Sequence, residues 1–290
     1  MRIGRRSFIQ IAGVAAGAGL VSTSTAMAST PDDDRLPGVL VDTTRCVGCR
    51  ACEAACAETN ELPPPPEGEQ VYQEMRDTST TSFTVVNKAN GERFAKKQCL
   101  HCLAPACASA CPVTALRKLP TGPVTYDASK CMGCRYCMVA CPFNVPKYEY
   151  EKLAPRVRKC TFCAPRQAQG LAPACTDVCP SGALTFGRRH ELMEEAKRRI
   201  YGTTGKYVNR VYGEREAGGT SWLYISDVPM ETLGLQGGVP EKPYPELVLG
   251  ALGAPPLVMT LWPPLLMGLY AFSKRREETD KQDGGEAHHG

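Results

Sequence analysis

The sequence predicts an α+β protein that is built from two similar modules and ends in one membrane-spanning helix. Three observations lead to this prediction: the 16 cysteines fall into four groups of four, two stretches of the chain are echoed further along it, and a long stretch near the C-terminus carries no charge. The formal net charge is only +4, and no basic stripe with interleaved aromatic residues indicates a nucleic-acid partner.

The first residues have the features of an export signal. The arginine pair Arg5-Arg6 precedes an apolar run from Ile11 to Val21, and Ala26-Met27-Ala28 fits a cleavage site. The arginine pair predicts the twin-arginine route, which resembles the route of proteins that are exported already folded with their cofactors in place. We therefore predict a signal peptide at 1–28, either cleaved or kept as an N-terminal anchor, and a polar linker at 29–37.

Each cysteine group has the size of a cluster-binding loop. The first and third groups have the spacing C-x2-C-x2-C-x3-C, in which three close thiolates bind one [4Fe–4S] cubane and the fourth binds the other cluster of a pair. The second and fourth groups are more widely spaced but also have four members. In chain order the groups are Cys46, Cys49, Cys52, Cys56; Cys99, Cys102, Cys107, Cys111; Cys131, Cys134, Cys137, Cys141; and Cys160, Cys163, Cys175, Cys179. They predict four [4Fe–4S] clusters with no cysteine left over.

Other uses of cysteine fit this pattern less well. Structural zinc sites usually take two separate C-x2-C pairs, and the overlapping triplets of the first and third groups depart from that arrangement. Disulfide frameworks are typical of small exported domains, whereas this chain has 290 residues. A structural zinc-binding protein stays as a remote alternative. No nucleotide-binding, nucleophile-elbow or zinc-protease motif is present, so no catalytic residue is predicted.

Two echoes predict an internal repeat. Val39–Arg50 returns as Val124–Arg135, and Cys111–Leu116 returns as Cys179–Leu184. Each unit is predicted to be a short strand, a cysteine loop, a short helix and a turn, and the glycine inside the loop frees its backbone for a positive φ. The repeat therefore predicts two ferredoxin-like modules within 38–190. One is contiguous and holds the second and third cysteine groups, and the other joins the first group to the fourth.

Exchange of the fourth cysteine within each module assigns four sets of ligands. We call them sets A to D. Set A is Cys46, Cys49, Cys52 and Cys179; set B is Cys160, Cys163, Cys175 and Cys56; set C is Cys99, Cys102, Cys107 and Cys141; and set D is Cys131, Cys134, Cys137 and Cys111. His101 lies inside the second group, and since every group already has four thiolates, we expect it to pack beside a cluster or donate to sulfur.

The region after the cysteine groups is predicted to connect them to a membrane. Apolar residues recur at helical spacing among the charged residues of Glu191–Ile200, which predicts an amphipathic helix. The residues that follow are rich in Gly, Tyr and Pro and are expected to run toward the membrane. We group 191–246 as a helix and membrane-proximal segment.

The uncharged stretch from Leu247 to Ser273 is long enough to cross a bilayer. Its two Pro-Pro pairs would break a helix in water, but a membrane helix that packs on a partner tolerates proline. Lys274-Arg275-Arg276 follow at once, and positive flanks stay cytoplasmic. We predict a transmembrane helix at 247–273 and a cytoplasmic tail at 274–290; a buried hairpin of a soluble domain is the alternative.

These motifs together resemble the four-cluster iron–sulfur subunits of respiratory complexes in the molybdoenzyme and hydrogenase families. The likeness covers nearly the whole chain and rests on Lys97–Cys102, Gly133–Pro142, Asn144–Tyr148 and Val211–Thr220. It is strongest to the iron–sulfur subunit of the periplasm-facing, membrane-bound [NiFe] uptake hydrogenase of the hydrogenase-2 type.

The resemblance implies a non-catalytic electron-transfer subunit. Its partners would be a periplasmic catalytic subunit, favoured as a [NiFe] hydrogenase, and an integral membrane subunit that binds quinone and docks on the 247–273 helix. A formate dehydrogenase or other molybdoenzyme and a multihaem cytochrome complex are the alternatives for the catalytic partner. The chain would lie on the periplasmic face of the inner membrane, cross it once and end in the cytoplasm. Basic residues beside the cysteines are expected to raise cluster potentials, form subunit contacts or act as ordinary surface charge; they are Arg50, Lys130, Arg135, Lys147 and Lys159.

Overall fold

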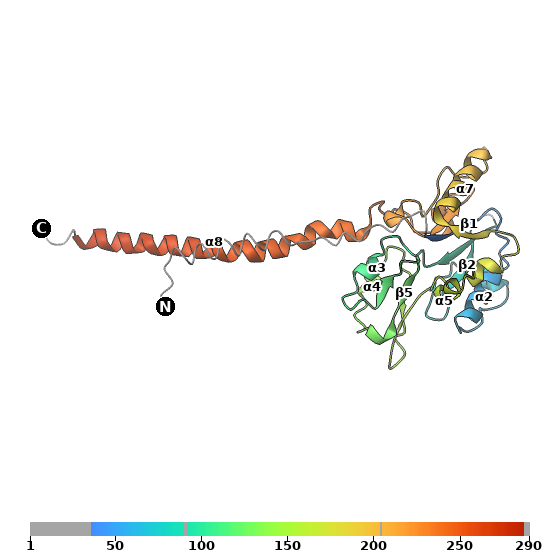
Figure 1. Cartoon of the computed structure of the whole chain (residues 1–290), viewed down its shortest axis with the longest axis horizontal. Coiled ribbons are helices and arrows are strands. Elements are labelled where there is room, and N and C mark those ends of the chain that lie inside the picture. Colours follow the sequence, from blue (N-terminus) through green and yellow to red (C-terminus); the bar gives the residue numbers. More distant parts are fainter. Residues whose placement is uncertain (1–35, 90–91, 204, 287–290) are drawn as a thin grey trace.

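A computed structural model describes residues 36–89, 92–203 and 205–286, with side chains at 249–254 and 279–286 left out of the description. The predicted signal peptide at 1–28 and most of the predicted linker lie outside these residues. Figure 1 shows a folded body that carries the cysteine groups and a long helix, α8 (Tyr244–Glu286), that projects from it.

The centre of the body is a three-stranded sheet in the order β8-β1-β9. Strand β1 (Pro37–Asp42) pairs antiparallel with β8 (Leu184–Arg188) and parallel with β9 (Trp222–Ile225). All four residues of β9 are fully buried, and so is most of β1, because both faces of the sheet are covered. The last residues of the predicted linker at 29–37 belong to the folded body: Leu36 is buried, and Pro37 is the first residue of β1.

Helix α7 (Arg189–Gly202) covers one face of this sheet. Its buried residues Leu192, Met193, Ala196 and Ile200 pack against apolar side chains of β1 and β9. This confirms the amphipathic helix predicted over 191–200, which is longer by two residues at each end. The opposite face of the sheet packs on cysteine loops, so α7 and the cysteine groups lie on opposite sides of it.

The remaining strands form short antiparallel pairs between the cysteine groups. The pairs are β2 (Thr84–Ala89) with β3 (Arg93–Gln98), β4 (Leu116–Lys118) with β5 (Val124–Tyr126), and β6 (Lys147–Tyr148) with β7 (Val157–Arg158). Short helices start within or just after the cysteine runs: α2 (Ala51–Thr59), α3 (Ala106–Ser109), α4 (Tyr136–Ala140), α5 (Ala164–Ala168) and α6 (Ala174–Asp177). Single 3-10 turns occur at Glu69–Tyr72, Ala128–Lys130, Glu216–Gly218 and Met230–Leu233.

The segment after α7 returns to the second cysteine group. The N–H of Leu103 donates to the Gly219 carbonyl at 3.0 Å, and the N–H of Ser221 donates to the Leu100 carbonyl at 3.1 Å. Strand β9 follows directly, so this segment closes the central sheet before the chain leaves the body. The segment that the sequence predicted to run toward a membrane therefore forms part of the core that surrounds the cysteines.

Helix α8 continues without a break through Pro255, Pro256, Pro263 and Pro264. Within it, Pro255–Glu278 is long and apolar enough to cross a membrane, and none of its most apolar window is buried. The predicted span at 247–273 overlaps this range, but the helix extends into the charged residues that were expected to form only a tail. The Thr260 hydroxyl donates to the carbonyls of Pro256 and Leu257 at 2.9 and 3.0 Å, so it is satisfied within the helix.

Candidate metal centres

The first and third cysteine groups have the same loop conformation. Gly48 and Gly133 have φ of +71° and +77°, and Arg50 and Arg135 follow at +60° and +62°, directly before α2 and α4 begin. A Cβ on Gly48 would lie 2.5 Å from the Phe94 ring, and one on Gly133 would lie 2.7 Å from the Tyr148 hydroxyl. The glycine is therefore required both by the positive φ, which the sequence predicted, and by a close side-chain neighbour, which it did not.

A second conformation recurs after the last cysteine of three groups. In each Cys-Pro-x-x sequence the fourth residue has a positive φ, +51° at Thr114, +51° at Asn144 and +62° at Gly182. Its N–H donates back to the cysteine carbonyl at 3.2, 3.2 and 3.3 Å respectively. Each Cys-Pro-x-x sequence is thus a hydrogen-bonded turn that reverses the chain direction directly after the cysteine.

The strands next to these turns also correspond. In the contiguous stretch, Leu116 of β4 is paired with Tyr126 of β5. In the central sheet, Leu184 of β8 is paired with Val41 of β1. The two echoes in the sequence relate Leu116 to Leu184 and Tyr126 to Val41, so equivalent residues meet in the same register.

The four thiols of set C lie together, and so do those of set D. Burial raises the pKa of the Cys102 thiol, and the neighbouring Cys99, Cys141 and Cys107 thiols raise it further. Burial likewise raises the pKa of Cys137 to about 11, with added contributions from Cys134, Cys111 and Cys131. In both cases the neighbours are the other three members of the expected set.

The thiols of sets A and B are gathered in the same way. Burial raises the pKa of Cys46, and Cys179 and Cys49 of set A raise it further. Burial also raises the pKa of Cys56 to about 12, and Cys175 and Cys163 of set B act in the same direction.

Neighbouring sets lie close enough that a thiol of one raises the pKa of a thiol in the next. Burial raises the pKa of Cys52 in set A to about 12, and Cys175 of set B raises it too. Burial raises the pKa of Cys160 in set B well above its ordinary value, and Cys99 of set C raises it further. Burial raises the pKa of Cys107 in set C to about 12, with a contribution from Cys137 of set D. The four sets therefore follow one another in the order A, B, C, D.

All 16 cysteines are free thiols in the structure. Among the described residues, no three or more His, Cys, Asp or Glu side chains are grouped closely enough to hold a single metal ion. In a cubane each of the four thiolates bonds to a different iron, so its ligands do not need to converge on one point.

Lysine ammonium groups beside the thiols provide a test of whether such clusters fit. Lys96 and Lys159 are only 2% and 5% exposed, and Lys118 is partly buried. The Lys118 Nζ donates to the Cys102 carbonyl at 2.9 Å and that of Lys159 to the Cys160 carbonyl at 3.0 Å, while Lys96 donates to Gln98.

None of these three lysines forms an ion pair with a carboxylate in the described part of the chain. A buried charge without a counter-charge costs several kcal/mol. Four thiolates on a cubane form an anionic group, which would provide the missing counter-charge. The residues present therefore fit [4Fe–4S] clusters, with the sixteen thiols as candidate ligands.

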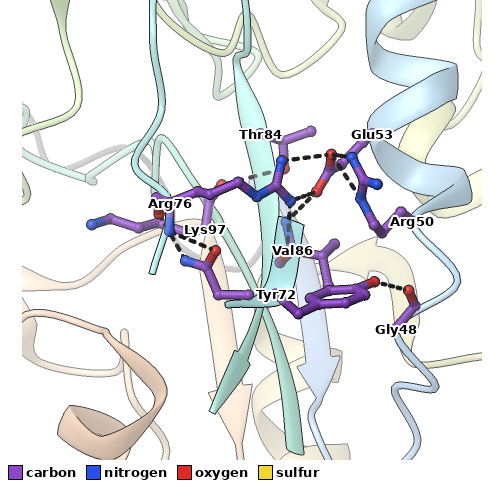
Figure 2. A network of polar contacts seen from close by, with 9 residues as sticks. Gly48, Arg50, Glu53, Tyr72, Arg76, Thr84, Val86 and Lys97 are labelled. Atoms are coloured by element: carbon purple, nitrogen blue, oxygen red, sulfur yellow. Dashed lines mark hydrogen bonds and ion pairs between the residues drawn. The ribbon is translucent and has the colours of Figure 1, made fainter. Parts of the chain in front are cut away.

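A buried carboxylate holds the first cysteine group against the β2–β3 hairpin (Figure 2). Glu53 of α2 accepts from Arg50 at 2.8 Å, from Arg76 at 2.5 Å and from the Val86 N–H of β2. Burial raises the pKa of Glu53, but the hydrogen bonds from the two guanidinium groups outweigh it, and the pKa is lowered. The Tyr72 hydroxyl donates to the Gly48 carbonyl and adds a second connection to the same loop.

His101 packs inside the protein and is not exposed. Its Nδ1 accepts from the Val124 N–H at 3.0 Å, and its ring stacks on Phe162 with 4.9 Å between centroids. Burial, with Lys159 and Lys118 nearby, lowers the pKa of His101 well below its ordinary value, so the ring is neutral. The expectation that His101 packs is confirmed.

The basic residues singled out in the sequence fall into different classes. Three are neutralised by carboxylates: Arg50 pairs with Glu53, Lys130 with Asp127 and Lys147 with Asp77. Arg135 lies over the Tyr148 and Tyr150 rings. Of these five residues, only Lys159 is buried beside the thiols without a carboxylate partner.

Sequence reasoning did not find Lys96, Lys118 or Glu53. Lys96 and Lys97 are neighbours on β3, and strand alternation places one on each face. No local signal tells which of the two is buried, because that depends on the packing of β3 against β9.

Comparison with known proteins identifies the family. The family model described as a 4Fe-4S dicluster domain matches residues 92–189. The chain is 48% identical to a protein of Nitratidesulfovibrio vulgaris, over 98% of this chain and 80% of the relative. It is 38% identical to the hydrogenase-2 operon protein HybA of Escherichia coli O157:H7, over 98% of this chain and 99% of the relative.

Iron–sulfur subunits of another enzyme are also similar. The chain is 34% identical to the iron-sulfur subunit of the nitrate-inducible formate dehydrogenase of Escherichia coli strain K12, over 70% of this chain and 72% of the relative. With the four groups of thiols and the buried ammonium groups beside them, these likenesses make [4Fe–4S] clusters the cofactors. The chain belongs to the family of non-catalytic, electron-transferring iron–sulfur subunits of respiratory oxidoreductases.

Proposed function

We propose that the chain carries electrons through four clusters between a periplasmic [NiFe] hydrogenase catalytic subunit and a quinone-binding subunit in the membrane. The observation that carries this proposal is the single row of thiol sets A, B, C and D: cysteines of sets A, B and C pack in one core cluster, and cysteines of sets C and D pack in another. A row of this kind provides a path from one end of the folded body to the other.

The ligand assignment is part of the proposal. Sets A and B would form one ferredoxin-like module and sets C and D a second, both within 38–190. The shared loop conformation, the repeated Cys-Pro-x-x turn and the equal strand register support this division. The grouping of thiols around Cys102 and Cys137 supports the exchange of the fourth cysteine.

The position of helix α8 supports an assignment of the membrane-facing end of the row. It contacts α3, which carries Cys107 of set C and leads into Cys111 of set D. In Figure 1, α3 and α4 lie on the side of the body toward α8, while α2 and α5 lie on the far side. The set D end would therefore meet the quinone-binding subunit, and the set A end the catalytic subunit.

The same proposal sets the position of the chain in the cell. Export through a twin-arginine signal at 1–28 would leave the body in the periplasm. The helix predicted at 247–273 would cross the inner membrane once, and Lys274-Arg275-Arg276 would keep 274–290 in the cytoplasm. The segment 191–246 would connect the body to the bilayer.

The hydrogenase partner is favoured by the extent of the likenesses. HybA, which is named for the hydrogenase-2 operon, is matched over 98% of this chain, whereas the formate dehydrogenase subunit is matched over 70%. A formate dehydrogenase or other molybdoenzyme is the second candidate because of that 34% identity.

Purification in mild detergent through a C-terminal tag, followed by mass spectrometry and metal analysis, tests this function. Nickel together with a hydrogenase large subunit is the expected result. Molybdenum, tungsten or a multihaem cytochrome in its place would overturn the hydrogenase partner and keep the electron-transfer role. Zinc in place of iron would overturn the cluster assignment itself.

A further inference from the structure

Among the residues that the structure describes, no carboxylate forms an ion pair with Lys96. Lys96 lies in β3, is 2% exposed, and its Nζ donates to Gln98 Oε1 at 3.0 Å. The same Nζ lies 4.6 Å from the centroid of the Trp222 ring, which is itself fully buried. The ammonium group is therefore held in place by a neutral amide and an aromatic face.

The surroundings of Lys96 include thiols of two sets. Trp222, which lies under the Lys96 ammonium, belongs to the same core cluster as the set B cysteines Cys56, Cys160 and Cys175, and Cys52 of set A packs against that cluster. Burial lowers the pKa of Lys96, but these four thiols raise it, and the pKa ends above its ordinary value. Lys118 and Lys159 act instead on thiols of set C, such as Cys102 and Cys107. Among the described lysines, Lys96 is thus the one that sits where sets A and B meet.

We infer that Lys96 raises the reduction potentials of the two clusters held by sets A and B, because its single ammonium charge lies near the ligands of both clusters. The inference rests on the proposed ligand sets. Adding an electron to a cluster adds negative charge beside the ammonium, and burial keeps their attraction from being screened by water. Because Lys96 borders both sets, it raises the reduction potential of each of these two clusters and leaves the potentials of the clusters of sets C and D unchanged.

Replacement of Lys96 by methionine tests the inference, because methionine keeps much of the volume and removes the charge. The measurements are iron per chain and an EPR-monitored redox titration of the full detergent-purified complex. We expect wild-type iron content and at least a tenfold lower equilibrium constant for reduction of two clusters, which is 59 mV for one electron. The other two clusters should keep their potentials, and Lys96→Arg should restore all four.

Lys97→Met is the matched control. Lys97 is the next residue of the same strand, points to the opposite face, and pairs with Asp77 at 3.1 Å. Removal of this charge should leave all four potentials unchanged. A shift as large as that of Lys96→Met would overturn the inference.

Gln98→Glu keeps the test decisive if Lys96→Met loses iron. It leaves Lys96 in place and sets a carboxylate at the atom that the ammonium now contacts at 3.0 Å. The same two potentials should fall. Unchanged potentials in this variant at full iron content, or loss of iron in both variants, would overturn the inference, whereas a wild-type complex without four clusters would instead overturn the proposed function.

Discussion

Single residues determine the shape of the cysteine loops. Gly48 and Gly133 are needed because the backbone takes a positive φ there and because an aromatic side chain lies against each of them. Arg50 and Arg135 take a positive φ without being glycine, and each immediately precedes a helix. The backbone of these loops is locally strained, and the surrounding contacts stabilise it in that conformation.

Gly48→Ala tests this requirement. The new Cβ would meet the Phe94 ring at 2.5 Å in a backbone conformation that alanine disfavours. We expect a loss of about 2 kcal/mol or more in the free energy of unfolding and a lower iron content, measured by thermal unfolding and metal analysis. Gly170→Ala is the control, because Gly170 has a φ of +76° but nothing within 4 Å of an added Cβ. Equal losses in both variants would contradict the role assigned to Phe94.

Cys134→Ser tests the ligand assignment at one residue. Cys134 is a member of set D, and its thiol lies beside Cys137. We expect reduced iron content and a changed EPR signal from one cluster, while the chain still fractionates with membranes, because α8 is separate from this loop. Unchanged iron content would refute the assignment.

Elements that are distant in sequence hold the cysteine loops in place. Helix α2 is joined to the β2–β3 hairpin through Glu53, and β1 is joined to β9 across most of the chain length. These long-range contacts bring Lys96 over Trp222, which packs in one core cluster with cysteines of sets A and B. The clusters are therefore surrounded by elements that the cysteine motifs do not contain.

Glu53→Gln tests the connection through α2. Breaking a buried ion pair by removing one charge costs about 3 kcal/mol, and here two arginines lose their partner. The variant should unfold at a lower temperature than the wild type. Glu58→Gln, at an exposed position of the same helix, should unfold like the wild type.

The same carboxylate predicts how stability depends on pH. The pKa of Glu53 is lowered from its ordinary value of 4.5, so the folded state favours the ionised form. Its contribution is present at pH values above 4.5 and is lost as the pH falls through the lower, folded-state value. The difference in melting temperature between wild type and Glu53→Gln should therefore stay constant from neutral pH down to 4.5 and shrink as the pH falls below that value. A difference that stays constant below pH 4.5 would contradict this role.

The sequence predicted the local parts of the site and missed the parts that depend on distant packing. The conformation of a cysteine loop and its need for glycine can be predicted, because both depend on a few neighbouring residues within one cysteine motif. The pairing of Leu184 with Val41 joins residues far apart in the sequence. The internal repeat makes it predictable, because the equivalent residues Leu116 and Tyr126 lie close together in the chain and pair in the same way. Lys96 could not be distinguished from Lys97, since the choice depends on β9, more than 100 residues away.

At the scale of the whole molecule, the folded body and helix α8 differ in what they bury and what they expose. The body buries thiols and ammonium groups together, whereas the apolar side chains of α8 from Pro255 to Glu278 are exposed. An exposed apolar helix that contains two Pro-Pro pairs requires an environment that satisfies it, and a bilayer with a partner helix would do so. The contact between α8 and α3 is where the two parts meet.

A chain that ends at Glu246 tests this division. It keeps Tyr244, which packs on the core, and removes the apolar helix. We expect it to be recovered from the periplasm in soluble form with the iron content of the full chain, because the exposed span from Pro255 to Glu278 adds no packing to the body. Cell fractionation and metal analysis measure both properties. If the shortened chain stayed with the membrane, α8 would not be its anchor, and a signal kept at 1–28 would replace it. A companion variant with Arg5→Lys and Arg6→Lys separates these cases, since it should leave the iron-loaded protein in the cytoplasm if the twin-arginine route is the one used.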